Sequence, residues 1–165
     1  YHPRRQWTLA SFVPRRNSQH ARAAGIRFVA QERTALSTLV LAGPPGSGKT
    51  HLLHALAQYA RSNASIDSIT CLSAPQWAQE VASGEHFGDL CDVMQRFVWH
   101  DLLALDDADR LWGMPQAQQA FADLMRERQA QGLRTLLTAT LYPASPHNPQ
   151  PLCDLLAQQT AVRLH

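Results

Sequence analysis

Cysteine and long apolar runs are scarce in this sequence. The only cysteines are Cys71, Cys91 and Cys153, and their spacing forms neither a disulfide framework nor a CxxC metal or redox pair. No apolar run approaches the roughly 20 residues of a membrane span, and the opening stretch YHPRRQWTL has no apolar core of a signal peptide. These absences argue against secreted and membrane classes and predict a cytoplasmic protein with reduced thiols.

Lysine is scarcer still, because Lys49 is the only one and arginine supplies every other permanent positive charge. Acidic residues are rare near the start, where residues 1–35 contain Glu32 alone against seven arginines: Arg4, Arg5, Arg15, Arg16, Arg22, Arg27 and Arg33. A basic segment of this kind fits DNA phosphates or an acidic partner, and it equally fits a solvated face in an arginine-biased protein.

What the sequence does contain is typical of one globular domain. The 165 residues are 45% hydrophobic and 17% charged, which is enough to build a layered core. Because Pro3 and Pro14 disfavour regular structure, we expect residues 1–14 to form a basic arm and residues 15–165 to form the domain.

Apolar segments of strand and helix character alternate along the chain. We expect strands at Thr38–Gly43, Ile66–Leu72, 101–107, 133–140 and 160–165, and helices at Asn17–Gln31 (capped by Asn17 or Ser18), 49–62, 115–132 and 151–157, with one or two more between residues 74 and 98. This alternation predicts an α/β fold with a parallel sheet between two helical layers. Ligands of such sheets bind beyond the carboxyl ends of the strands.

One strand end carries a phosphate-binding motif. The stretch GPPGSGKT, residues 43–50, matches GxxxxGK[ST] between a predicted strand and a predicted helix. Its glycines let successive backbone N–H groups point at phosphate oxygens, while Lys49 reaches the β- and γ-phosphates and the Thr50 hydroxyl ligates Mg²⁺. A compact ammonium fits this closed loop better than a forked guanidinium, which explains a lysine at this position.

Two other strand ends carry polar side chains. DLLALDD ends in Asp106, a candidate Mg²⁺ ligand, and Asp107, a candidate base that orients the attacking water. Thr138 and Thr140 end a further strand and are candidates to contact the γ-phosphate or the attacking water. His51 and His54 have no nearby third metal ligand in the sequence, so we interpret them as packing or surface residues. We expect Trp77, Trp99 and Trp112 to lie in the core or to face a partner.

These segments together resemble the AAA+ ATPase domain of the bacterial replication initiator DnaA, and more closely its regulator Hda. WTLASFVPRRNSQHARAA is similar to that family's opening segment, GPPGSGKTHLLHAL to its P-loop and next helix, LLALDDADRL to its Walker B segment, and LLTATLYP to its sensor 1 strand. The resemblance extends over nearly all of the chain.

The resemblance implies a three-layer P-loop fold whose five-stranded parallel sheet has the order 5-1-4-3-2. It implies a nucleotide switch that binds ATP or ADP with Mg²⁺ and hydrolyses slowly or not at all. The residues that it assigns to the nucleotide are Gly43, Pro44, Pro45, Gly46, Ser47, Gly48, Lys49, Thr50 and His51, with Phe12 and Val13 beside the adenine, Thr50 and Asp106 on Mg²⁺, and Asp106, Asp107 and Thr140 in catalytic roles.

The implied partners are a DnaA-type initiator or other replication proteins, with the sliding clamp, DNA and further copies of the chain as additional candidates. The chain departs from the family at PLCDLLAQQ, where Leu155 stands at the place of the arginine finger, and it ends before the helical lid. The stretch from Gln6 to Phe12 also fits a QxxLxxF clamp-binding peptide, although the same residues fit the family's opening segment.

Other readings remain open from the residues alone. A helicase loader such as DnaC, or a transposition-helper ATPase, shares the same core and couples nucleotide to single-stranded DNA or a helicase. A small kinase fits the length but not the segment that precedes the P-loop. A protein-binding scaffold with little hydrolysis fits the absent finger and lid.

Overall fold

The computed structural model describes residues 1–16, 18–30, 36–63, 66–140 and 160–164. The helices are α1 (Ser18–Ala30), α2 (Lys49–Asn63), α3 (Ala74–Phe87), α4 (Leu90–Val98), the short 3₁₀ helix η1 (Ala108–Gly113) and α5 (Pro115–Ala130). The strands are β1 (Thr38–Ala42), β2 (Ile69–Ser73), β3 (Leu102–Asp106), β4 (Arg134–Ala139) and β5 (Thr160–Arg163). No helix within these described ranges has the length and apolarity to cross a bilayer.

The strands form one parallel sheet in the order β2-β3-β4-β1-β5. This is the expected order 5-1-4-3-2 counted from the other edge, so the predicted fold class is confirmed. In register, Ala42 lies opposite Ala139 and Ser73 lies opposite Asp106. The segments that follow β1, β3 and β4 therefore leave the sheet at the same edge, where the sequence placed its candidate site.

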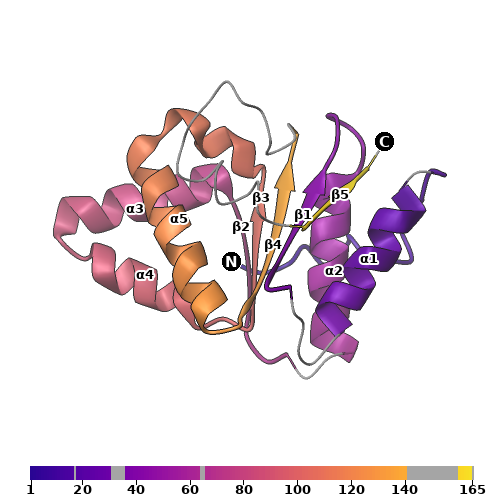
Figure 1. The fold of residues 1–165 in the computed structure, drawn as a ribbon, viewed down its shortest axis with the longest axis horizontal. Helices are drawn as coiled ribbons and strands as arrows, with labels where there is room; N and C mark the ends of the chain where they lie inside the picture. Colours follow the sequence, from indigo (N-terminus) through magenta and orange to yellow (C-terminus); the bar gives the residue numbers. More distant parts are fainter. Residues whose placement is uncertain (17, 31–35, 64–65, 141–159, 165) are drawn as a thin grey trace.

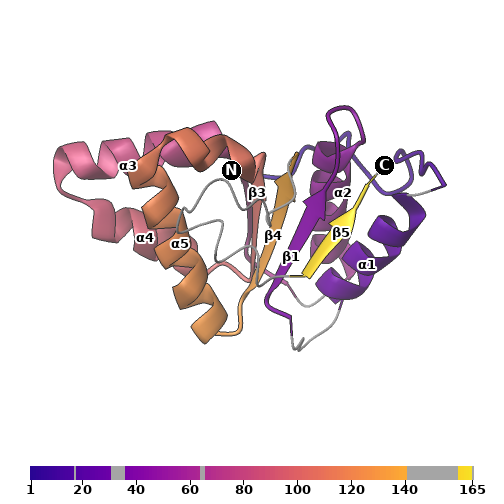
Figure 2. The ribbon, with the colours of Figure 1, turned by 45° about the horizontal axis from the view of Figure 1, so that its top comes forward.

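Helices cover both faces of the sheet, as Figure 1 shows with α1 and α2 on one side and α3, α4 and α5 on the other. Figure 2 gives the same separation after a turn about the horizontal axis. Alternating strand residues supply the two cores: Leu39 and Leu41 pack toward α1 and α2, whereas Val40 belongs to the opposite cluster. Strands buried on both faces read as continuous apolar runs, which is the pattern seen in LVLA and LLAL.

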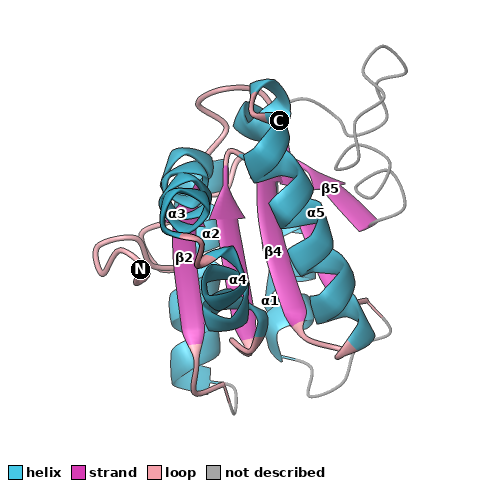
Figure 3. Ribbon diagram, turned by 90° about the vertical axis from the view of Figure 1, so that its left-hand side faces the viewer, coloured by secondary structure: helices cyan, strands magenta, loops and turns pink. Residues whose placement is uncertain are grey.

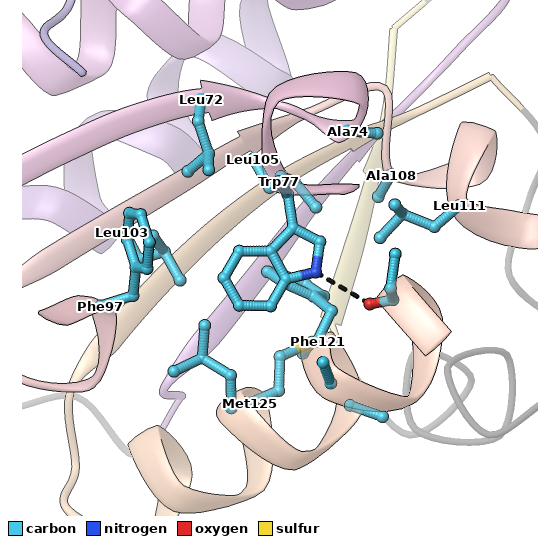
Figure 4. Packing of buried hydrophobic residues seen from close by; sticks show 14 of the residues in the cluster. Leu72, Ala74, Trp77, Phe97, Leu103, Leu105, Ala108, Leu111, Phe121 and Met125 are labelled. Carbon is cyan, nitrogen blue, oxygen red and sulfur yellow. Dashed lines mark hydrogen bonds between the residues drawn. The ribbon is translucent and has the colours of Figure 1, made fainter. Parts of the chain in front are cut away.

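Trp77 is the centre of the core beneath α3, α4 and α5, and Figure 4 shows its indole surrounded by apolar side chains. Its ring lies edge-on to Phe97 and Phe121 at centroid distances of 5.5 and 5.6 Å. Its Nε1–H donates to the carbonyl oxygen of Ala117 at 2.8 Å, so burial leaves no polar atom of the side chain unpaired.

The main differences from the sequence prediction lie at the start of β2 and after β3. β2 begins at Ile69 rather than Ile66, because the backbone N–H groups of Asp67 and Ser68 donate to the Asp101 carboxylate instead of to a neighbouring strand. The segment after Asp106 forms η1, which the sequence analysis did not predict. The region between residues 74 and 98 divides into α3 and α4 because Gly88 adopts a left-handed conformation (φ 75°).

The segment before α1 packs against α2. The Phe12 side chain is buried with Leu52, Leu53 and Leu56, and Trp7 lies beside His51 and His54. The Gln58 side chain donates to backbone carbonyls of Arg4 and Trp7. Our expectations for Asn17, for the helix at 151–157 and for Leu155 fall outside the described residues.

Candidate nucleotide site

The GPPGSGKT loop leaves β1 and enters α2 at Lys49. Gly48 has φ 92°, a left-handed conformation that side chains disfavour, and a Cβ there would lie 3.1 Å from the Phe12 ring. At Gly43 a Cβ would lie 2.3 Å from the Leu164 carbonyl oxygen, so the loop begins in close contact with the chain that follows β5. Glycine at these two positions lets the loop close between the arm and β5.

Lys49 lies inside this loop with 6% of its surface exposed. Its Nζ donates to the carbonyl oxygens of Gly43 and Pro44, at 2.9 Å each. A buried ammonium is tolerated where acceptors satisfy it, and these two carbonyls use two of its three protons. The remaining donor capacity and the positive charge are available at the N-terminal end of α2, where the helix dipole also favours an anion.

Ser47 provides a test of whether this loop fits a phosphate group. Its Oγ is buried and has no hydrogen-bond partner among the described residues. A buried hydroxyl without a partner costs free energy, and such groups in native proteins call for an explanation. A phosphate oxygen in the loop supplies the missing partner, so the residues present fit a nucleotide phosphate.

Asp106, at the end of β3, is held by two hydroxyl groups. Its Oδ1 accepts hydrogen bonds from Thr138 Oγ1 at 2.6 Å and from Thr50 Oγ1 at 3.0 Å. The structure thus brings together the P-loop threonine and the carboxylate that the sequence assigned to Mg²⁺. A hydroxyl and a carboxylate are oxygen donors of the kind that Mg²⁺ prefers, and Mg²⁺ needs only one or two protein ligands beside phosphates and water.

Asp107 adopts a left-handed backbone conformation (φ 56°, ψ 50°), which turns the chain out of β3. Its backbone N–H donates to Thr138 Oγ1 at 2.8 Å. Burial, together with the nearby carboxylates of Asp106 and Asp109, raises the pKa of the Asp107 carboxyl. The side chain therefore sits in a negative environment at the edge of the sheet, where a cation or a water molecule is favoured.

Thr138 and Thr140 have different surroundings. Thr138 is fully buried in β4 and orients Asp106 and Asp107, whereas Thr140 follows the strand and is half-buried. The backbone N–H of Thr140 donates to Asp109 Oδ1 at 3.0 Å. Asp109 had no role in the sequence analysis, and only the spatial meeting of η1 with the end of β4 reveals one.

His51 points toward the arm. Its Nε2 lies 3.1 Å from the Thr8 carbonyl oxygen and 3.2 Å from Ser11 Oγ, and its ring stacks on Trp7 at 5.9 Å. His54 accepts the Arg4 backbone N–H at Nδ1, at 3.3 Å, and burial lowers its pKa. Both histidines attach the arm to α2, which agrees with a packing role.

The remaining sequence candidates are divided between core and surface. Phe12 is buried against Gly48, but the Val13 side chain is 85% exposed. Trp77 is in the core, Trp112 is half-buried and Trp99 is 59% exposed. In the part of the chain that the structure describes, no cluster of three His, Cys, Asp or Glu side chains forms a metal site.

Comparison with known proteins decides the family. The pattern of the bacterial DnaA ATPase domain matches residues 4–150, which is most of the chain. This chain belongs to the DnaA ATPase domain family. The likeness to DnaA drawn from the P-loop, Walker B and sensor 1 segments is thereby confirmed, and the fold is that of an AAA+ core.

Individual relatives agree with the family. The chain is 28% identical, over 136 residues, to the chromosomal replication initiator protein DnaA of Herminiimonas arsenicoxydans, an alignment that covers 82% of this chain and 30% of that protein. The chain therefore spans less than a third of the length of this relative. AMPPCP-bound DnaA from Aquifex aeolicus has the same fold, with a TM-score of 0.89 and 20% identity over 99% of this chain and 51% of that one.

A helicase loader is also similar in fold. The DnaC helicase loader superposes with a TM-score of 0.76 and 15% identity, covering 98% of each chain. At these identities the two solved structures establish the fold alone. The family pattern favours DnaA, while the loader shares the fold.

Proposed function

We propose that this DnaA-family domain binds ATP or ADP with Mg²⁺ and acts as a nucleotide-dependent switch in the initiation of bacterial DNA replication or its regulation. The observation that carries the proposal is the meeting of Lys49, Thr50 and Asp106 at one edge of the sheet, together with a Ser47 hydroxyl that has no hydrogen-bond partner among the described residues. The AMPPCP-bound DnaA relative, which holds an ATP analogue, supports the same ligand class.

In this proposal the loop from Gly43 to Thr50 holds the phosphates through backbone N–H groups and Lys49. Thr50 and Asp106 hold Mg²⁺, which neutralises phosphate charge when it is bound. Phe12 lies against the loop at Gly48 and is placed to line the base side of the nucleotide. Val13 is a weaker candidate for that contact, because its side chain is exposed to solvent.

Hydrolysis is proposed to be slow. The base position holds Asp107, whose side chain is one methylene shorter than the Glu of many AAA+ motors, and its backbone is tied to Thr138. An arginine finger is worth orders of magnitude in phosphoryl transfer, and Leu155 stands where the family presents one. These two features favour a switch of the Hda type. In this switch Thr140 has the sensor 1 role, in which it contacts the γ-phosphate or the attacking water.

The proposed partners are a DnaA-type initiator, other replication proteins and further copies of this chain through AAA+ surfaces. Binding of the sliding clamp through the segment from Gln6 to Phe12 is disfavoured by the packing, since Phe12 would have to leave the core. Substitution Gln6→Ala tests this directly, because Gln6 is exposed and the fold does not depend on it. If that variant loses clamp binding, the segment from Gln6 to Phe12 is a clamp ligand after all.

A helicase loader is the second candidate function, favoured by the match in fold to DnaC. The two functions differ in the protein that responds to nucleotide. Pull-down with purified DnaA and with the replicative helicase, each with ATP, ADP or no nucleotide, separates them. Nucleotide-dependent capture of the helicase, without capture of DnaA, would favour the helicase-loader function over a switch that acts on DnaA.

The first test of nucleotide binding is calorimetric titration of the chain with ADP and with a non-hydrolysable ATP analogue, each with Mg²⁺, beside Lys49→Ala. We expect micromolar or tighter binding that the substitution abolishes. Arg61→Ala is the control, because this exposed arginine ends the same helix without touching the loop. Equal binding by Lys49→Ala and the unchanged protein would refute the proposed site.

A further inference from the structure

The two threonines at the end of β4 differ in how their hydroxyl groups are used. The Thr138 hydroxyl donates its proton to Asp106 and accepts the backbone N–H of Asp107. The Thr140 side chain is half-buried, and its hydroxyl forms no hydrogen bond within the part of the chain that the structure describes. Of the two hydroxyl groups, only that of Thr140 therefore keeps its proton for a ligand.

The peptide group between Ala139 and Thr140 joins the P-loop to the segment that follows β3. Its oxygen, the Ala139 carbonyl, accepts the Gly43 N–H at 3.1 Å. Its N–H, that of Thr140, donates to Asp109 Oδ1 at 3.0 Å. A peptide group is planar, so hydrogen bonds on its two sides fix both its position and its tilt. The direction in which the Thr140 side chain leaves the backbone therefore depends on Gly43 and on Asp109.

The position of β4 explains why a side chain supplies this acceptor. β4 is the central strand of the sheet, with β3 on one side and β1 on the other (Figure 3). The register of β3 and β4 runs to the pair Leu105 and Leu137, and Asp107 then turns the chain out of β3. β3 thus ends before it reaches Thr140, whose N–H still needs a partner. The Asp109 carboxylate takes the place of the strand carbonyl.

The short helix η1, which carries Asp109, is itself anchored in the core. Ala108 and Leu111, which flank Asp109, are fully buried in the cluster around Trp77, as Figure 4 shows. The carbonyl oxygen of Leu111 also accepts the side-chain amide of Gln118, a buried residue of α5, at 3.4 Å. Asp109 therefore holds the end of β4 from a fixed support, and its carboxylate can define where Thr140 lies.

We propose that Asp109 is a positioning residue of the nucleotide site, which holds Thr140 so that its hydroxyl meets the γ-phosphate and the domain favours ATP over ADP. This inference rests on the proposed nucleotide switch. It gives a role in distinguishing the two nucleotides to a residue outside the P-loop and outside the strands. Because ADP lacks the γ-phosphate, loss of the hydrogen bond from Thr140 to Asp109 should weaken binding of ATP more than binding of ADP.

The test is titration calorimetry of the full chain with Mg²⁺ and either ADP or a non-hydrolysable ATP analogue. The variants are Asp109→Ala and Asp109→Asn, which remove the same charge, but the Asn side chain keeps an oxygen that can accept the Thr140 N–H. The measured quantity is the ratio of the Kd for ADP to the Kd for the analogue. Asp92→Ala, which removes an exposed carboxylate from α4, is the surface control, and thermal melts verify that each variant folds.

We expect Asp109→Ala to lower this ratio by about tenfold, the equivalent of one hydrogen bond to a charged group. Asp109→Asn and Asp92→Ala should keep the ratio of the unchanged chain. Thr140→Val should lower the ratio as well, because it removes the hydroxyl itself. Adding Asp109→Ala to Thr140→Val should cause no further fall, since both substitutions act on the same contact with the phosphate.

An equal fall of the ratio in Asp109→Ala and Asp109→Asn would mean that the charge matters rather than the acceptor, and would overturn the proposal. A ratio that Asp109→Ala leaves unchanged would overturn it too, whether or not both affinities fall together. So would additive falls in the double variant. Each of these results leaves the proposed nucleotide binding intact as long as Lys49→Ala abolishes it. No binding of either nucleotide by the unchanged chain would instead overturn the proposed function and this inference together.

Discussion

The Thr138 hydroxyl donates to Asp106 Oδ1 at 2.6 Å and accepts the Asp107 backbone N–H at 2.8 Å. One buried side chain on β4 thus fixes both acidic residues that end β3. The Thr50 hydroxyl shares the same carboxylate oxygen, so the P-loop helix, β3 and β4 meet at a single atom. The geometry of the proposed Mg²⁺ site depends on this meeting.

Replacing Thr138 by valine keeps the shape of the side chain and removes its hydroxyl. We expect the free energy of unfolding to fall by about 1–3 kcal/mol, since a buried N–H and a buried carboxylate each lose a partner. Nucleotide affinity should fall more with Mg²⁺ present than with EDTA. Urea unfolding and calorimetry measure the two effects. Thr140→Val is the control for stability alone, because among the described residues its backbone N–H and not its hydroxyl forms a hydrogen bond; equal losses of unfolding free energy in the two variants would contradict the assignment.

Lys49→Arg tests why the only lysine of the chain is at this position. Charge is conserved, but a guanidinium is larger and needs a different arrangement of acceptors than the carbonyls of Gly43 and Pro44 provide. We expect nucleotide affinity to fall at least about tenfold, equivalent to about 1.4 kcal/mol. Titration calorimetry measures it, with Arg61→Lys as the reverse exchange on the surface of α2. Undiminished binding by Lys49→Arg would show that charge alone is required.

Arg128 on α5 is the buried cation that secures the opposite end of the sheet. Burial lowers its pKa to about 10, so it remains charged at neutral pH, and its guanidinium donates to the carbonyl oxygens of Phe97, Val98, His100 and Arg134 and to Thr135 Oγ1. Arg128→Met should lower the free energy of unfolding by about 3 kcal/mol or more, because several buried acceptors lose their donor. Arg126→Met, exposed on the same helix, should change it by less than about 0.5 kcal/mol. Similar losses in urea unfolding would argue against the buried network.

Asp101 gives the stability a defined pH dependence. Burial opposes ionisation of its carboxyl, but hydrogen bonds from Ser68 N–H, Ser68 Oγ and Asp67 N–H outweigh burial and lower the pKa. A lowered folded-state pKa means that the stabilisation is present above the unfolded value near 4 and is lost as pH falls through the folded value.

Asp101→Asn should therefore destabilise the protein at pH 7 by about 1–2 kcal/mol, with solvent screening at this partly exposed site keeping the effect modest. The difference from the unchanged chain should shrink as the pH falls below about 4. Urea unfolding at a series of pH values measures it. Asp67→Asn is the control, since its backbone rather than its carboxylate bonds to Asp101. A difference that does not vary with pH would point to a role for shape alone.

The family and the phosphate loop were predictable from the sequence because their signals are local. GPPGSGKT needs its three glycines and one lysine, and those residues act through the backbone conformation of the same eight positions. The alternation of apolar runs with helical segments likewise specified a parallel sheet, since its strands are buried on both faces. The strand order followed from the resemblance to DnaA rather than from periodicity.

Tertiary structure alone decided how side chains from separate segments meet. Thr138 and Thr140 are equivalent in the sequence, yet burial in β4 places the first on Asp106 and leaves the second to bond Asp109 through its backbone. The start of β2 depends on Asp101, which is more than thirty residues away along the chain. His51 follows the P-loop directly, but its ring is hydrogen-bonded to Thr8 and Ser11 of the arm, which packs over α2. Local pattern determines which elements form, whereas contacts between distant residues depend on packing, and packing is set only when the layers assemble.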